Sequence, residues 1–443
     1  MASYKNIVSI INELSFYSLM ILPLAYIFSP ALVNMIIVII VCNFLLSSFF
    51  YKDYSLFNNN LFKILILFWL YISIQSFFLE HANIGKSTSY LRFLILPFAI
   101  TFLLNYHLEK INKLKFFYIT TVVLVIIDIL IQYYTGKDLL GYRADQINGF
   151  FDDFEKWNTH NLQRFAGPFG FDKKAGTFIL VFGIIGFFLN LENLDKIRIP
   201  YYLIFVFIIS SSIIITGDRS PLLALIITFG FFFIFEKKDK RIILLLISLV
   251  AIFLLFLNFS KYTKYRYIQN IKEYSQILTS NDKPKNDLTE QYDTEKVSLE
   301  MKIKKVIKDN PWSAHYLTSI EIIKSSPIFG KGIRSFRYEC EKYPNINSSY
   351  ADHRCSTHPH NSLFELLSEI GFLGFILFVW VIYELMKIIN KRLISGNMIF
   401  YLMISLILPI KPTGAIFSTW FGSILWILVG FYFWEKNKKK ISK

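Results

Sequence analysis

Repeated apolar runs of membrane length constrain this chain more than any other feature of its sequence. A bilayer core about 30 Å thick needs about 20 apolar residues per spanning helix. About twelve such runs lie at 7–29, 31–50, 61–79, 87–105, 114–134, 176–192, 200–216, 221–236, 241–258, 362–389, 397–411 and 414–434. Hydrophobic residues make up 54% of the 443 positions and charged residues 18%, a balance that excludes an ordinary soluble protein. The sequence therefore predicts an all-α polytopic membrane protein with about twelve transmembrane helices.

The distribution of lysine and arginine among the short loops predicts the orientation in the membrane. If the N-terminus is cytoplasmic, most short-loop cations fall on the cytoplasmic side, as the positive-inside rule requires. Examples are Lys110, Lys196, Lys237, Lys391 and the basic tail 436–443. The formal net charge of +15 is thus explained by topology, and binding of nucleic acid is not expected. Both termini are predicted to be cytoplasmic.

Two connections, 135–175 and 259–361, are long, and both fall on the outer side. The second, about a hundred residues, is too long to be an idle connection. Its first half is polar around 281–286 and is predicted to be mobile, whereas an amphipathic helix with Leu317, Ile320, Ile323 and Ile322 as apolar-face candidates is predicted over 316–326. Three regions are predicted. Residues 1–258 contain transmembrane helices 1–9 and the outer loop 135–175, and residues 259–361 form a large helical outer loop with the catalytic segment. Residues 362–443 contain transmembrane helices 10–12 and the basic cytoplasmic tail.

A polar cluster with several histidines lies immediately before the tenth apolar run. Outside the cytoplasm its Cys355 can form a disulfide with Cys340, which would close a loop of about 15 residues and contribute about 3 kcal/mol. The alternative is a metal site, because His353, Cys355, His358 and His360 all carry ligand-type side chains. A metal site would leave Cys340 as a free thiol in an oxidising compartment.

The third interpretation of the cluster is acid–base catalysis. Residues 362–365 (SLFE) fit a capping box, which predicts that a helix starts near Asn361 or Ser362. His360 would then lie at a helix N-terminus, where the helix dipole favours a neutral imidazole that can accept a proton. A helix-capping role for His358 or His360 is the structural alternative.

Arg219 lies in the very short outward-facing turn 216–220 between two apolar runs. Because an arginine at such a depth is costly, it is expected either to pair with Asp218 or extend to the membrane surface, or to bind phosphate through its planar guanidinium fork. Asp128, a lone acid inside the fifth run, is expected to pair with a neighbour. Further candidate phosphate ligands are Arg92, Arg164, Arg334 and Arg337.

Several motifs, taken in chain order, resemble the O-antigen ligase family. They are 164–170 (RFAGPFG), 216–220 (TGDRS), 327–332 (PIFGKG) followed by Phe336-Arg337, 358–361 (HPHN) and 369–374 (EIGFLG). The resemblance covers the chain from about 90 to 390. It implies a metal-independent glycosyltransferase of the GT-C type, without a cofactor, in the bacterial inner membrane with its active site on the periplasmic face.

The resemblance also implies a reaction and roles for individual residues. Such enzymes transfer a glycan from an undecaprenyl-pyrophosphate carrier to a hydroxyl of lipid A-core in lipopolysaccharide assembly, with inversion. His360 takes the place of the family's base, with His358 as the second candidate, and Arg219 that of its first pyrophosphate-binding arginine. The second arginine is missing from 312–316 (WSAHY), so His315 or Arg337 is expected to replace it. Arg164 and Arg92 complete the expected pyrophosphate ligands.

Other functions share parts of this pattern. An O-antigen polymerase or a protein O-oligosaccharyltransferase would use the same carrier chemistry and differ in the acceptor. A transporter for lipid-linked sugars would instead place polar groups throughout the spans and have little outer domain. A metal sensor is the remaining class. The expected partners of the ligase are the lipid-linked glycan donor, the lipid A-core acceptor and membrane lipids.

Overall fold

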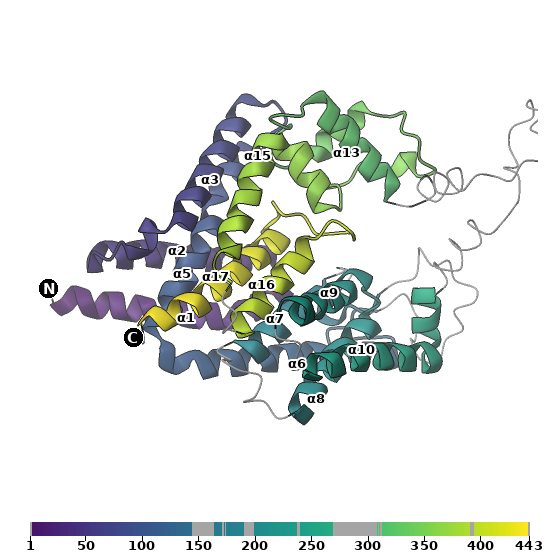
Figure 1. The fold of residues 1–443 in the computed structure, drawn as a ribbon, viewed down its shortest axis with the longest axis horizontal. Helices are drawn as coiled ribbons and strands as arrows, with labels where there is room; N and C mark the ends of the chain where they lie inside the picture. The colour runs from purple at the N-terminus through teal and green to yellow at the C-terminus, as the bar shows by residue number, and fades with distance from the viewer. Residues whose placement is uncertain are drawn as a thin grey trace, which may run out of the picture.

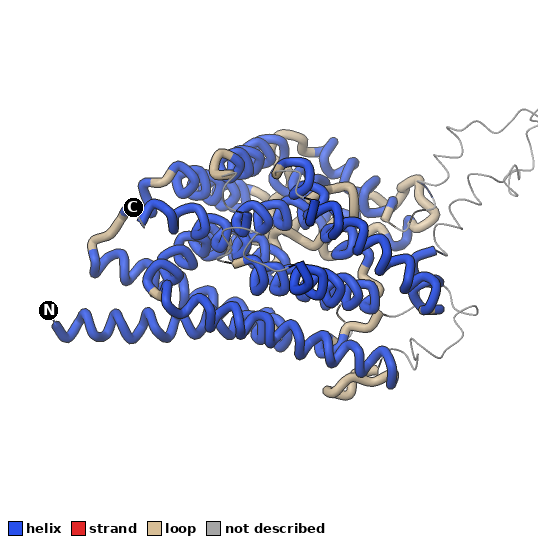
Figure 2. Tube along the Cα trace, turned by 60° about the horizontal axis from the view of Figure 1, so that its bottom comes forward, coloured by secondary structure: helices blue, strands red, loops and turns tan. Residues whose placement is uncertain are grey.

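A computed structural model describes most of the chain, and the described part is helical throughout (Figures 1 and 2). The described residues are 2–143, 164–170, 172, 174–189, 199–236, 240–268, 308, 310, 312–389 and 394–441. Within them, β-pairing is limited to an isolated bridge between Lys137 and Arg143. The predicted mobile stretch 281–286 lies outside the described residues.

Apolar helices form the body of the molecule, and shorter elements connect them. The apolar helices are α1 (Ala2–Phe28), α2 (Pro30–Tyr51), α3 (Asn60–Phe78), α5 (Leu91–Tyr106), α6 (Ile111–Thr135), α7 (Ala175–Phe188), α8 (Ile199–Thr216), α9 (Arg219–Phe235), α10 (Lys240–Phe259), α15 (Ser362–Met386), α16 (Ile394–Ile407) and α17 (Thr419–Ile441). The shorter helices are α4 (Ile84–Ser89), α13 (Ser313–Ser325) and α14 (Phe336–Glu339), and the 3-10 turns are η1 (Ser55–Asn58), η2 (Leu108–Lys110), η4 (Gly167–Phe169), η6 (Cys340–Lys342) and η7 (Ala351–His353).

Each predicted apolar run coincides with one of the apolar helices in the described part of the chain. Six helices there are long and apolar enough to cross a membrane, or seven if the bent pair Leu246–Phe259 and Lys261–Ile268 counts as one span. Four further apolar helices are shorter. The protein is therefore a multi-pass membrane protein, and the figure of about twelve spans stays a prediction. Both described chain ends lie on one side of the molecule, and α13 lies on the other (Figure 1).

Glycines allow the apolar helices to approach closely, as small residues do in membrane bundles. Helix α17 packs against α5, and a Cβ on its Gly430 would lie 3.2 Å from the Cα of Pro97. Helix α7 packs against α6, and a Cβ on its Gly186 would lie 3.3 Å from the backbone nitrogen of Ile119. Asp128 of α6 is paired with backbone, because its carboxylate accepts a hydrogen bond from the Leu139 N–H at 2.7 Å.

Helix α15 is interrupted at Gly371, which has a φ of 65° and a ψ of −175°. The N–H groups after the break turn to another segment of the chain. Phe372 donates to the Pro327 carbonyl at 2.9 Å, and Leu373 donates to the Ile328 carbonyl at 3.1 Å. Backbone groups of a membrane helix need such replacement partners when the helix is broken, because no water is present to satisfy them.

The carbonyl groups before the break are satisfied by the same segment. Lys331 donates to the Ser368 carbonyl at 2.9 Å, and Gly332 donates to the Glu369 carbonyl at 2.7 Å. A Cβ on Gly330 would lie 2.5 Å from the Gly371 nitrogen, so the approach requires glycine. The motifs 327–332 and 369–374 are therefore joined by backbone hydrogen bonds into one interlock. This interlock fixes residues 327–332 to α15.

Helix α13 forms close to the predicted position and ends before Pro327. It spans Ser313–Ser325, three residues earlier at its start than 316–326. Its fully buried apolar side chains are Ala314 and Ile322, and Ile322 packs with Phe336 and Cys340. Leu317, Ile320 and Ile323 are only partly buried. The buried face is thus rotated toward the smaller and polar residues of the helix.

Candidate active site

Helix α15 begins at Ser362, as predicted, but a different residue caps it. The Asn361 side chain accepts hydrogen bonds from the N–H groups of Leu363 at 3.0 Å and Phe364 at 3.3 Å. The predicted capping box from Ser362 to Glu365 is wrong, because asparagine already satisfies the helix end and the glutamate turns elsewhere.

Glu365 anchors the connection between α16 and α17, residues 408–418. Its carboxylate is 1% exposed and accepts hydrogen bonds from the N–H groups of Ile416 at 2.9 Å and Phe417 at 3.3 Å. One turn later, the Glu369 carboxylate accepts from the Arg334 N–H at 2.7 Å. Two carboxylates on one face of α15 therefore hold the two segments that flank residues 356–361, here called the histidine loop.

His360 lies at the centre of a cluster of rings. Its ring centroid is 4.1 Å from that of His358, 4.7 Å from that of Trp312 and 5.2 Å from that of His315. Its φ of 58° is in the left-handed region, which costs an L-residue about 1 kcal/mol, and its carbonyl accepts from the Thr413 N–H at 2.9 Å. The strained backbone is thus held by the α16–α17 connection.

Both ring nitrogens of His358 have partners. Nε2 lies 3.4 Å from the Thr413 carbonyl and must donate to it, because a carbonyl only accepts. Nδ1 then accepts from the Thr357 hydroxyl at 3.0 Å. Burial lowers the pKa of His358 to about 4, and the charges of Arg334 and Arg337 act in the same direction. His358 is therefore neutral at physiological pH.

His315 projects from α13 toward His360. Its Nδ1 donates to the Arg354 carbonyl at 3.1 Å, and burial lowers the pKa of the imidazole below its ordinary value. A neutral imidazole cannot supply the permanent charge of an arginine. The structure thus brings His315 to the candidate base, and away from the turn that contains Arg219.

A first cation group consists of Arg164, Arg219 and Arg266. Asp218, which was one expected partner of Arg219, pairs with Arg164 at 2.5 Å and accepts from the Gly176 N–H at 3.1 Å. Arg219 Nη2 donates to the Arg266 carbonyl at 2.6 Å. Arg266 lies on helix Lys261–Ile268, the second half of the bent pair. The sequence did not indicate Arg266 as a candidate, because this residue is in no motif.

A second cation group consists of Lys86, Arg92, Arg334 and Arg337. Arg92 Nε donates to the Asn34 side chain at 2.6 Å, and Arg337 Nη2 donates to the Thr357 carbonyl at 3.4 Å. Lys86 lies within electrostatic range of the three arginines. Sequence reasoning missed Lys86, which looks like an exception to the positive-inside pattern unless the fold is known.

The two cation groups approach the histidine loop by different routes. Arg337 contacts the loop directly at Thr357. The first group reaches it through the α16–α17 connection, because Ser220, next to Arg219, donates to the Pro412 carbonyl at 3.0 Å and Thr413 contacts both loop histidines. The residues predicted to bind pyrophosphate thus fall in three places: Arg219 with Arg164, Arg337 with Arg92, and His315 beside His360.

Cys340 and Cys355 form a disulfide with their Cα atoms 5.3 Å apart. Arg354 extends the link, since its Nε donates to the Cys340 carbonyl at 3.3 Å and its own carbonyl holds His315. Because Cys355 is in the disulfide, it is not available as a thiolate ligand of the alternative metal site. Among the residues that the structure describes, no group of three or more His, Cys, Asp or Glu side chains is arranged to hold a metal ion.

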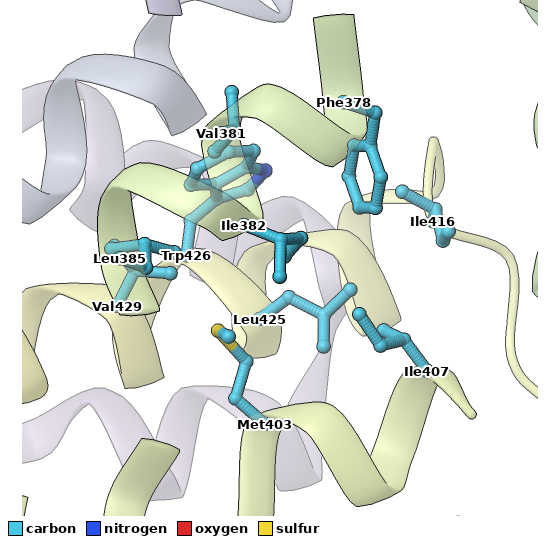
Figure 3. A pocket seen from close by; sticks show the side chains of 10 residues that line it. All are labelled: Phe378, Val381, Ile382, Leu385, Met403, Ile407, Ile416, Leu425, Trp426 and Val429. Carbon is cyan, nitrogen blue, oxygen red and sulfur yellow. The ribbon is translucent and has the colours of Figure 1, made fainter. Parts of the chain in front are cut away.

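An apolar pocket lies between α15, α16 and α17 (Figure 3). Its volume is about 330 Å³, including space open to the surroundings, and its lining side chains are apolar or aromatic. One of them, Ile416, belongs to the connection that Glu365 anchors. Such a lining offers no group for acid–base chemistry.

These features define a multi-pass membrane protein with a cluster of histidines and two groups of cations linked to it. Residues 204–379 match the family model described as O-Antigen ligase, and the chain carries an O-antigen ligase family domain over these residues. The matched range includes Arg219, Arg334, Arg337, His358 and His360. The family is one of membrane enzymes that transfer glycans. No curated protein matches the chain significantly.

Proposed function

We propose that the protein transfers a glycan from an undecaprenyl-pyrophosphate carrier to a hydroxyl of lipid A-core, with His360 as the general base. The observation that carries the proposal is the position of His360 in the described fold. It packs against His315 and His358 at the start of α15, and the Arg337 guanidinium contacts the same loop at Thr357. Neutral imidazole accepts the proton and fixed cations bind the anionic leaving group, as such a transfer requires.

The hydrogen bonds of the two neighbouring histidines give them structural tasks. His358 uses both nitrogens, on Thr413 and Thr357, and His315 uses Nδ1 on a backbone carbonyl. The strained φ of His360 also supports a functional role, since such conformations persist where the surroundings impose them. The family resemblance selects the same residue.

The pyrophosphate is assigned to the first cation group. This group contains three arginines, and the carboxylate of Asp218 pairs with Arg164 and accepts from the Gly176 N–H. Guanidinium groups bind phosphate oxygens in a planar, bidentate manner. In the reaction, the bond from the anomeric carbon to the acceptor oxygen forms as the bond to the pyrophosphate oxygen breaks, and His360 receives the hydroxyl proton. A direct displacement of this kind inverts the anomeric centre.

The test of the base is transfer by purified protein in nanodiscs, with a lipid-linked glycan and lipid A-core as substrates. His360→Ala is expected to lower kcat by at least roughly a hundredfold, because general-base catalysis contributes that much. His353→Ala is the matched control and should retain wild-type activity, since His353 is an exposed residue outside the ring cluster. Wild-type turnover by His360→Ala would refute the assignment.

A polymerase or a protein O-oligosaccharyltransferase would use the same donor site with another acceptor. A strain lacking the protein separates these functions. Intact polymer left on the carrier lipid indicates a ligase, whereas single repeats still attached to lipid A-core indicate a polymerase.

A further inference from the structure

The second cation group, Lys86, Arg92, Arg334 and Arg337, has more positive charge than the fold around it neutralises. None of the four side chains forms an ion pair with an acid among the described residues. The nearby carboxylates are committed to backbone N–H groups, as described for Glu365 and Glu369. Glu339, on the same short helix as Arg337, pairs with Lys342 and His81.

The fold holds the backbone of Arg334 in an unfavourable conformation. Its φ is 64°, in the region that disfavours L-residues, and Glu369 fixes its N–H. The preceding Ile333 carbonyl accepts from the Asn83 N–H at 3.2 Å, which joins this segment to the one that carries Lys86. Burial and repulsion by Arg337 lower the pKa of Arg334, while the acids Glu369 and Glu365 act in the opposite direction. An anion would relieve this repulsion.

The Arg337 side chain has a buried donor that the described fold does not satisfy. Its Nε is buried and has no hydrogen-bond partner in the described part of the chain, while Nη2 reaches only the Thr357 carbonyl, at 3.4 Å. A buried donor of a charged group without a partner is costly and rare in native proteins. A phosphate oxygen would satisfy it.

The position of the group relative to the candidate base decides which substrate it faces. Arg337 contacts Thr357, whose hydroxyl donates to His358, and that ring packs against His360. The first cation group lies beyond the α16–α17 connection. In an inverting displacement the base and the attacking hydroxyl are on the face opposite the leaving group. Cations on the side of the base therefore face the acceptor.

We propose that the second cation group is an acceptor site that binds phosphate groups of a lipid-borne glycan. This inference rests on the function proposed above. Two acceptors share the chemistry, a phosphorylated lipid A-core and a second pyrophosphate-linked glycan. A hydroxyl on a protein, with no phosphate beside it, would not use these cations.

The experiment measures KM for donor and acceptor separately in nanodiscs. The acceptors are phosphorylated lipid A-core, the same lipid after enzymatic dephosphorylation, and a lipid-pyrophosphate glycan. The variants are Arg337→Gln and Arg334→Gly, of which the second removes the guanidinium and suits the positive φ, so that the fold is retained. Lys324→Gln, on the exposed face of α13, is the matched control.

Both variants are expected to raise KM for a phosphate-bearing acceptor at least roughly tenfold, with donor KM unchanged. The dephosphorylated acceptor should show no difference between variant and wild type. A response with lipid A-core identifies its phosphates as the ligand, and a response with the pyrophosphate-linked glycan identifies that carrier. An increase in donor KM, or equal effects on phosphorylated and dephosphorylated acceptor, would overturn the inference. Failure of the wild type to transfer to any acceptor would instead overturn the proposed function.

Discussion

The histidine loop gives neighbouring residues of the same type different chemistry through their hydrogen bonds. His358 donates from Nε2 to Thr413 and accepts at Nδ1 from Thr357, so it is fixed in one tautomer. His360 is held instead by its backbone, through the Thr413 N–H and its left-handed φ. The ring of the first histidine packs against that of the second, and Thr413 contacts both.

The low pKa of His358 predicts a pH-dependent stability. Its folded pKa of about 4 is below the ordinary value of 6.5, so the unfolded chain binds the proton more readily. The stabilisation is therefore complete above about pH 6.5 and is lost as the pH falls from there toward 4. We expect the thermal midpoint to decline over this range, and His358→Gln, which keeps a donor toward Thr413 but does not titrate, to remove part of the decline. An identical pH profile for the variant would contradict the assignment.

Substitutions of Arg219 test whether donor binding needs the planar guanidinium or only a positive charge. Its Nη2 donates to the Arg266 carbonyl, which fixes the orientation of the guanidinium. Arg219→Ala is expected to raise donor KM at least roughly tenfold, and Arg219→Lys to recover little of it, because an ammonium lacks the planar fork. Full recovery by lysine, measured as donor KM, would indicate a point charge only.

At the scale of elements, α15 organises the site through its cap, its two carboxylates and its break. Asn361 starts the helix, Glu365 and Glu369 hold the flanking segments, and Gly371 opens the backbone to residues 327–332. The candidate site residues therefore depend on α15 for their positions. Of these residues, only those of the histidine loop are close to α15 in the sequence.

Gly371→Ala tests the interlock. A Cβ there would lie 2.4 Å from the Ile328 carbonyl oxygen on a backbone with positive φ, so we expect a loss of at least about 1–2 kcal/mol in stability, with reduced transfer activity. Gly230→Ala in α9 is the matched control. Its Cβ would meet nothing within 4 Å, and alanine favours helix by about 1 kcal/mol. A thermal midpoint unchanged in Gly371→Ala would show that the break is not needed.

At the scale of the whole molecule, contacts between distant segments assemble the site. The first cation group unites the η4 segment, the α8–α9 turn and the bent helix after α10. The second unites the α4–α5 region with the segment around α14. The α16–α17 connection links the first group to the histidine loop, and the disulfide joins η6 to Cys355, just before that loop.

The disulfide should protect the assembly. In a Cys42→Ser background, the native protein is expected to resist thiol labelling until it is reduced, and reduction should lower the free energy of unfolding by about 3 kcal/mol. Mass spectrometry of labelled protein and thermal unfolding with and without reductant provide the measurements. Ready labelling of unreduced protein would exclude the bond.

The sequence by itself determined the elements and most of the candidate residues. Apolar runs predicted where the membrane helices lie, because hydropathy is a local property, and Asn361, Pro327 and the glycines marked helix ends and turns. The tertiary structure decided the partners. It gave Asp128 to Leu139, Glu365 to the α16–α17 connection, and Asp218 to Arg164, and it divided the predicted phosphate ligands into separate groups. These pairings join a side chain to backbone or charge far away in the chain, and such contacts leave no period or spacing in the sequence from which they could be read.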